Sequence, residues 1–308
     1  MPTLIALFSI VTQTESYCRK NLRRRKVLLT IERTFKKELD IMLAENLKST
    51  GDQPVLLDVD ERVAKLTLNR PDKYNTLTES VIAVITDNLN DIAQREDIHV
   101  VIIKSTGKAF STGHDLKDMH ANNDEKYFRM LLTNCSKMML RINTIPQPVI
   151  AQVQGITTAA GCQLVAACDL AVASRNAQFA TNGISNGLYC ATPAVALSRV
   201  VSKKHALEML LTGSFISAQR AAEIGLINSV VAEDLLDSET SALAEKIAGK
   251  SSFTSRLGKR SFYEQIGKNL PDAYEQTSED LVCNLLSTDG QEGLSAFLEK
   301  RPPKWDNK

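Results

Sequence analysis

The sequence has no apolar run long enough to cross a membrane and no excess of charge of either sign. The most apolar stretch near the N-terminus, residues 4–11, is interrupted by Ser9, whereas a transmembrane helix needs about 20 apolar residues. The 308 residues include 37 lysines and arginines against 36 aspartates and glutamates, a net charge of +1. Such a balance creates no field that would attract nucleic acid or an anionic membrane. We therefore expect neither nucleic-acid binding nor membrane insertion.

Patterns for metal binding and disulfide bonding are also missing. The six cysteines form no CxxC pair and have no histidine partner at zinc-finger spacing, and there are only four histidines. The one cluster with possible ligands, His114, Asp115, Asp118 and His120, matches no rigid ligand array. We expect reduced, mostly buried thiols, no metal and no cofactor.

Three common catalytic motifs are absent, namely HExxH, GxxxxGK[ST] and GxGxxG. Their absence argues against a zinc protease, a P-loop enzyme and a dinucleotide enzyme. A GxSxG match occurs at residues 183–187, but no acid lies between Ser185 and His205, the only later histidine. A hydrolase triad in the order serine, acid, histidine cannot be completed, so the match is interpreted as a chance feature of a loop.

The composition changes at the N-terminus, where six of the eight residues 19–26 are lysine or arginine. Glu15 is the only acid before Glu32. Basic, acid-poor leaders with serine and threonine resemble mitochondrial transit peptides. We expect residues 1–51 to be a leader and linker, and the protein to reside in the mitochondrial matrix. A solvated basic arm on a cytosolic protein is the alternative.

In the remaining sequence, stretches with the two-residue periodicity of strands alternate with stretches that have the 3.6-residue periodicity of helices. Hydrophobic residues make up 43% of the chain, which is enough for a buried core. A hairpin at 55–68 is followed by a helix that Thr78 caps and by a short apolar strand. The expected elements are strands at 55–58, 63–68, 100–104, 149–153 and 170–173, and helices at 78–93, 124–142 and 159–167. This order predicts an α/β fold. From Asp234 onward only amphipathic helices are expected, so we assign an α/β domain to 52–233 and a helical region to 234–308.

Two loops with glycine stand out. Residues 109–116, AFSTGHDL, follow a buried strand, and residues 154–164, QGITTAAGCQL, lead from a strand into a helix whose first turn is built from small residues. Small residues allow a ligand to approach the backbone, and a helix N-terminus offers unpaired N–H groups that stabilise negative charge on an oxygen. Close packing of the helix on a sheet is the alternative reason for these residues.

From about Val55 to Trp305, the sequence resembles the enoyl-CoA hydratase/isomerase, or crotonase, superfamily. The marks are LNRP at 68–71 with Asn75 and Leu77, FSTGHDL at 110–116, 148–154 leading into AAGCQL, CDLA at 168–171, and residues from Glu292 to Arg301. The resemblance implies a crotonase-like spiral of ββα units with a C-terminal helical trimerisation region. It also implies acyl-CoA thioesters as ligands and a homotrimer or dimer of trimers.

The same resemblance assigns roles to residues. The backbone N–H groups of His114 and Ala160 would form an oxyanion hole, which fits the negative charge that an acyl-CoA thioester oxygen gains as an enolate forms. The residues expected to contact the acyl-CoA are His114, Asp115, Leu116, Lys117, Ala160, Phe297 and Lys300.

The chain departs from the family pattern at the acidic positions. The two glutamates of the hydratases correspond to Gln163 and Gly183, and a third acidic position corresponds to Ala191. Glutamine cannot carry a proton in transfer, and glycine has no side chain. We therefore expect an acyl-CoA-binding protein that is not an ordinary hydratase.

Two other readings stay open. The first is an enzyme that uses an enolate and another proton route, such as a decarboxylase resembling methylmalonyl-CoA decarboxylase, because Gly113, His114 and Asp115 resemble that branch. Asn186, Tyr189 and Cys190 are further polar candidates for such chemistry. The second is a purely structural or interaction role.

Overall fold

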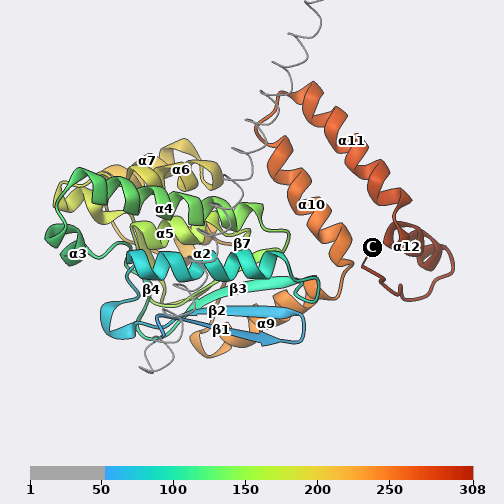
Figure 1. Ribbon diagram of the computed structural model, residues 1–308, viewed down its shortest axis with the longest axis horizontal. Helices are drawn as coiled ribbons and strands as arrows, with labels where there is room; N and C mark the ends of the chain where they lie inside the picture. The colour runs from blue at the N-terminus through green and yellow to red at the C-terminus, as the bar shows by residue number, and fades with distance from the viewer. Residues whose placement is uncertain (1–52, 308) are drawn as a thin grey trace, which may run out of the picture. The chain divides into compact units, whose positions relative to one another are not determined.

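The structure, a computed structural model, describes residues 53–307 (Figure 1). The predicted leader at residues 1–51, with its basic run at 19–26, lies outside the described residues.

A six-stranded sheet forms the first layer. Its strands, in spatial order, are β1 (Val55–Asp60), β2 (Val63–Leu68), β3 (Val100–Ser105), β5 (Val149–Val153), β7 (Leu170–Ser174) and β10 (Ser229–Val231). Only the β1–β2 pair is antiparallel, and the others are parallel. The predicted hairpin and the three apolar strands after it are confirmed.

A smaller four-stranded sheet runs beside it. Its order is β4 (Ala109–Ser111), β6 (Ile156–Thr158), β8 (Gln178–Ala180) and β9 (Ile216–Ser217). Three times the chain passes from a long strand of the first sheet to a short strand of the second, in the pairs β3–β4, β5–β6 and β7–β8, and then enters helical structure. This repetition is the spiral of ββα units that the resemblance implied, and the predicted fold class is confirmed.

Helices cover both faces of the six-stranded sheet, and side-chain alternation in β3 shows why. Val101 and Ile103 face the large core cluster that includes α2 (Glu79–Ala93), whereas Val100 and Ile102 face α9 (Leu236–Ala248). The remaining helices of the α/β part are α3 (Leu116–Ala121), α4 (Glu125–Thr144), α5 (Ala160–Ala167), α6 (Ala191–Val200), α7 (Lys203–Thr212) and α8 (Ala218–Glu223). Thr78 caps α2 as predicted, by accepting a bond from the Val81 N–H.

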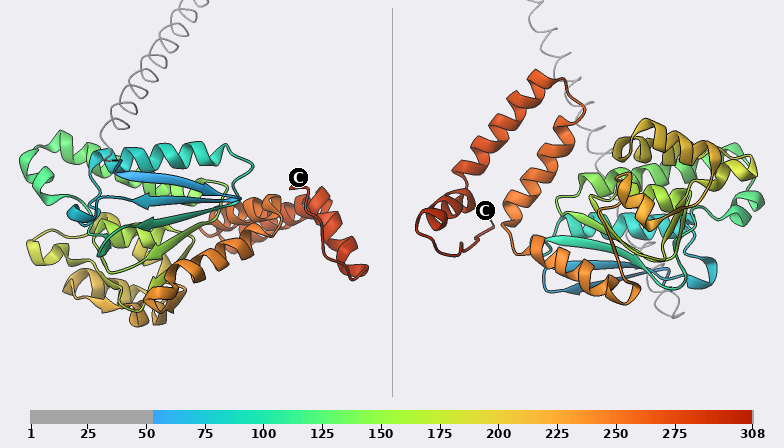
Figure 2. Two further views of the ribbon diagram at one scale, coloured as in Figure 1. Left: turned by 90° about the horizontal axis from the view of Figure 1, so that it is seen from below. Right: turned by 180° about the vertical axis from the view of Figure 1, so that it is seen from behind.

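After α9 the chain continues as three helices, α10 (Ser252–Gln265), α11 (Leu270–Leu286) and α12 (Thr288–Leu298). They project to one side of the sheets (Figures 1 and 2). The predicted boundary at 233–234 precedes α9, which packs on the sheet, and it stays a prediction. Within residues 53–307, no helix is both long and apolar enough to span a membrane.

Candidate functional site

The two glycine-containing loops predicted from the sequence meet in backbone contact. Gly113 has a φ of +83°, and a Cβ added there would lie 2.9 Å from the backbone nitrogen of Ala160. A Cβ on Gly161 would lie 2.2 Å from the carbonyl oxygen of Ser111. Both distances are too short for a real side chain, so glycine at these positions is what allows β4 and the start of α5 to lie together.

This contact brings two free amides to one place. Ala160 is the first residue of α5, and His114 follows Gly113. Within the described part of the chain, neither backbone N–H has a hydrogen-bond acceptor. Ala159, just before the helix, has φ 49° and ψ −119°, a conformation that a residue with a side chain adopts only under strain. The arrangement is able to stabilise negative charge on an oxygen held between the two amides.

Asn75 holds the first loop in place. Its side-chain amide donates to the carbonyl oxygens of Thr106 at 2.8 Å and Ala109 at 2.9 Å. Its own carbonyl oxygen accepts a 2.8 Å bond from the Ser111 hydroxyl. Asn75, one of the residues on which the family resemblance rests, therefore has a structural role. It ties the segment before α2 to β4.

The His114 side chain is fixed from the same segment. Its Nδ1 lies 3.1 Å from the carbonyl oxygen of Leu77, and because a carbonyl only accepts, Nδ1 carries the hydrogen. Burial lowers the pKa of His114 below its usual value. The ring is therefore neutral near pH 7, and its Nε2 is a buried atom with no partner among the described residues.

A cavity of about 560 Å³ opens beside these amides. The chain surrounds it with residues from α3, α4, the two glycine loops and the segment 182–193, together with Thr76 and Phe215. Its lining consists of Thr76, Thr112, His114, Leu116, Met119, Leu132, Ile156, Thr158, Ala159, Ala160, Asn182, Gly183, Asn186, Leu188, Tyr189, Cys190, Ala191, Thr192, Pro193 and Phe215. This volume and apolar character suit a small organic ligand.

The cavity gathers four of the residues to which the resemblance assigned oxyanion, acid or ligand roles, namely His114, Leu116, Ala160 and Gly183. The other candidates named from the sequence, Asn186, Tyr189, Cys190 and Ala191, line it as well. Gln163 is buried one turn further along α5, and its Oε1 has no partner among the described residues, but it does not line the cavity.

The other expected contacts lie elsewhere. Asp115 caps α3 by accepting from the Lys117 N–H at 2.9 Å, and the Lys117 side chain is exposed. Phe297 is 82% exposed on α12, and Lys300 follows that helix. Neither of these two lines the cavity of its own chain, since α12 and α3 lie at opposite ends of the described part (Figure 1). The roles assigned to these residues stay predictions.

Gly183 is required by its surroundings. It lies in the 3₁₀ turn η2 (Asn182–Asn186), where an added Cβ would be 2.5 Å from the carbonyl oxygen of Leu188 and 2.9 Å from Cys190 Sγ. The turn closes tightly on the glycine, so no larger residue fits without moving the segment that borders the cavity.

Several lining residues were not singled out from the sequence. Leu132, Ile156 and Phe215 belong to segments far apart in the chain, and an apolar residue carries no sign that it borders a cavity. Phe215 reaches the site because β9, the next element, pairs with β8.

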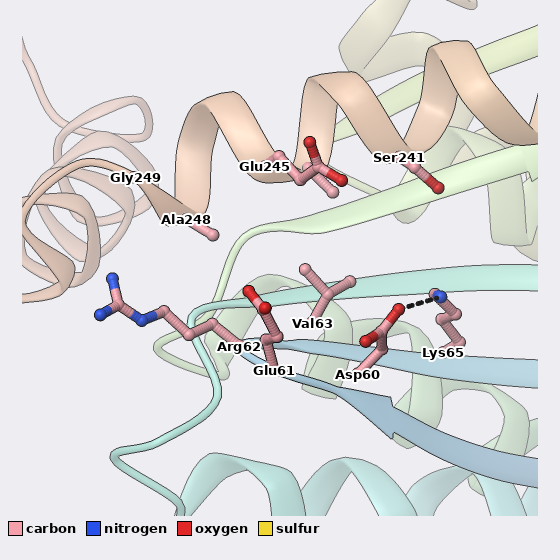
Figure 3. Close-up of a pocket in the computed structure, with 10 residues that line it drawn as sticks. Asp60, Glu61, Arg62, Val63, Lys65, Ser241, Glu245, Ala248 and Gly249 are labelled. Atoms are coloured by element: carbon pink, nitrogen blue, oxygen red, sulfur yellow. Dashed lines mark hydrogen bonds and ion pairs between the residues drawn. The ribbon is translucent and has the colours of Figure 1, made fainter.

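The second cavity and the clusters of polar side chains elsewhere in residues 53–307 do not combine free amides with an apolar lining. A second cavity of about 430 Å³ lies between the β1–β2 turn and α9 (Figure 3). Charges of both signs line it, including an Asp60–Lys65 ion pair at 3.1 Å. Across residues 53–307, no group of three or more histidine, cysteine or acidic side chains is placed to hold a metal ion. Four of the described cysteines are buried, as expected, and Cys283 is exposed.

Comparison with known proteins places this architecture in a family. The enoyl-CoA hydratase/isomerase model matches residues 58–308. A Xenopus laevis protein named enoyl-CoA hydratase domain-containing protein 3, mitochondrial, is 45% identical over 250 residues, 81% of this chain and 85% of the relative. The human protein of the same name is 45% identical over 245 residues, 80% of this chain and 81% of the relative.

Solved structures agree. The crystal structure of that human protein matches with a TM-score of 0.81 at 45% identity, and covers 82% of this chain and 100% of its own. An enoyl-CoA hydratase from Mycobacterium smegmatis matches with a TM-score of 0.81 at 47% identity, and covers 82% and 99%. The names of the animal relatives confirm the predicted mitochondrial localisation. With a family match over most of its length and relatives above 40% identity, the chain belongs to the enoyl-CoA hydratase/isomerase, or crotonase, family.

Proposed function

We propose that the protein binds acyl-CoA thioesters in mitochondrial acyl-CoA metabolism and does not act as an ordinary enoyl-CoA hydratase. The observation that carries the proposal is the pair of free amides, His114 N–H and Ala160 N–H, at the edge of an apolar cavity. A thioester oxygen placed between them would accept two hydrogen bonds, while the acyl group would lie among Leu116, Leu132 and Phe215.

The missing acids support the second half of the proposal. Adding water to an enoyl thioester requires one group to take a proton from water and another to protonate the α-carbon. By the family resemblance these groups would stand at Gln163 and Gly183. Among the residues that line the cavity none is an aspartate or glutamate, so no carboxylate replaces them.

Matched ligands test the binding mode. Butyryl-CoA carries the thioester oxygen, whereas its thioether analogue, S-butyl-CoA, has the same chain length without it. Because each hydrogen bond contributes about 0.5 to 1.5 kcal/mol, we expect butyryl-CoA to bind about tenfold more tightly in calorimetric titration. Equal affinities, or no binding of either compound, would contradict the proposal.

Gly161→Ala is expected to damage the site. The new methyl group would meet the Ser111 carbonyl at 2.2 Å and force β4 away from α5. We expect about 1 to 3 kcal/mol of destabilisation from overpacking, and a loss of butyryl-CoA affinity of at least about tenfold because the amides separate. Thermal unfolding and calorimetric titration measure the two effects.

Gly258→Ala on α10 is the matched control. A Cβ there has no neighbour within 4 Å, so the helix should gain up to about 1 kcal/mol and ligand affinity should not change. A Gly161→Ala variant that binds butyryl-CoA as tightly as the wild type would show that the contact does not position the amides.

We also propose that the chain assembles as a trimer or a dimer of trimers through α10, α11 and α12. These helices expose large apolar side chains, and Phe262, Ile266, Leu281, Leu286 and Phe297 are each more than half exposed. Covering them with a second copy would remove this apolar surface from water. Light scattering at micromolar concentration is expected to give three or six times the chain mass, and a monomeric mass would contradict the prediction. In such an assembly Phe297 and Lys300 would reach the CoA of a neighbouring copy.

A further inference from the structure

The cavity lining carries no charged side chain that could pair with a charge on an acyl group. The described lining residues include threonines, asparagines, a tyrosine and a cysteine, but no lysine, arginine, aspartate or glutamate. The one side chain in the lining that ordinarily titrates near neutral pH is His114, and among the described residues its ring has a polar contact to the carbonyl of Leu77 alone. Because burial lowers the pKa of His114, the ring is neutral near pH 7 and supplies no cation.

A carboxylate on an acyl group that enters the cavity would meet no partner of opposite charge among the described lining residues. Burying an unpaired ion costs far more than burying a neutral polar group of the same shape. The two free amides do not remove this cost, because in the proposed binding mode both bond to the thioester oxygen. Neutral polar substituents meet no such penalty, since threonine and asparagine side chains are able to donate and accept hydrogen bonds.

We propose that the cavity selects acyl-CoA thioesters whose acyl group is uncharged and rejects those whose acyl group carries a carboxylate. This inference rests on the proposed function, because it names the ligand class of the same site. It also bears on the decarboxylase alternative, whose substrate carries a free carboxylate on its acyl group that no residue of the described lining would neutralise.

Three matched ligands test this proposal: butyryl-CoA, succinyl-CoA and the amide of succinyl-CoA. Succinyl-CoA and its amide have nearly the same size and polarity, and they differ by one charge. At pH 7.5 we expect the amide to bind within about tenfold of butyryl-CoA and at least about 30-fold more tightly than succinyl-CoA in competition against a fluorescent acyl-CoA. CoA without an acyl group provides the baseline for contacts outside the cavity.

The outcomes separate this inference from the proposed function. If butyryl-CoA binds and succinyl-CoA binds as tightly as its amide, the inference is wrong while acyl-CoA binding stands. If no acyl-CoA binds more tightly than free CoA, both are wrong. If methylmalonyl-CoA is bound as tightly as butyryl-CoA and is decarboxylated, the selection proposed here is overturned and the enzymatic alternative replaces it.

Discussion

Wild-type protein is expected to hydrate crotonyl-CoA at least about 10⁴-fold more slowly than an ordinary enzyme, whose turnover lies at about 1 to 10³ per second. A general acid or base contributes about 10² to 10⁴, and two of them are missing. An oxyanion hole is worth about 10² to 10³ for each donor, which does not replace proton transfer. Loss of the enoyl absorbance over hours, at high protein concentration, measures the rate. Turnover at an ordinary rate would show that another group supplies the proton.

Restoring the acids is constrained by the fold at one of the two positions. Gln163 is buried and lies outside the cavity lining, so a glutamate there would be favoured as the neutral acid. That form has nearly the size and planar shape of glutamine, so Gln163→Glu should fold and raise hydration up to about 10²-fold, with Gln163→Met as the control that adds no carboxyl group. Gly183→Glu is different, because even its Cβ would meet the Leu188 carbonyl at 2.5 Å. We expect the double variant to lose stability by about 1 to 3 kcal/mol and to gain no further activity. A double variant that is stable and faster than Gln163→Glu would contradict this account of the turn.

Lys259→Ala is expected to lower the free energy of unfolding by about 3 to 5 kcal/mol. The Lys259 ammonium lies 2.6 Å from Asp169 Oδ2 and also donates to the carbonyl oxygens of Ile142 and Gln147. Only 6% of the Lys259 side chain and 14% of the Asp169 side chain are exposed. Removing the cation leaves Asp169 buried with hydrogen bonds from Tyr263 and Val149 alone, and a buried charge without its counter-ion is costly. Chemical denaturation followed by circular dichroism measures the loss.

Two further variants test the cause. Arg260→Ala, on the same helix, breaks a pair with Asp280 in which the arginine is 57% exposed, so it should cost less than about 1 kcal/mol. Lys259→Met with Asp169→Asn removes both charges and keeps a side-chain acceptor for the Val149 N–H, so it should recover most of the stability. A loss in the double variant as large as in Lys259→Ala would assign the effect to packing rather than to the unpaired charge.

The sequence by itself determined the elements whose signals are local. The alternation in 63–68 and the apolar run at 100–104 predicted β2 and β3, and Thr78 predicted the start of α2, because period and capping depend on residues close together in the chain. The two glycine loops were also identified, since a backbone that turns or approaches another chain segment closely requires glycine.

Only the tertiary structure decided which of these parts meet. The contact between Gly113 and Ala160, and the placement of Leu132 and Phe215 in one cavity, depend on strand order across two sheets. The packing around Gly183 also became visible only in the structure. The sequence shows that a family acid is missing at this position, but it does not show that the Leu188 carbonyl lies too close for any side chain. Such contacts join residues that are far apart in the sequence or that lie in an irregular turn. Because no periodic pattern in the sequence identifies the partner, these contacts are determined only by the packing of the whole chain.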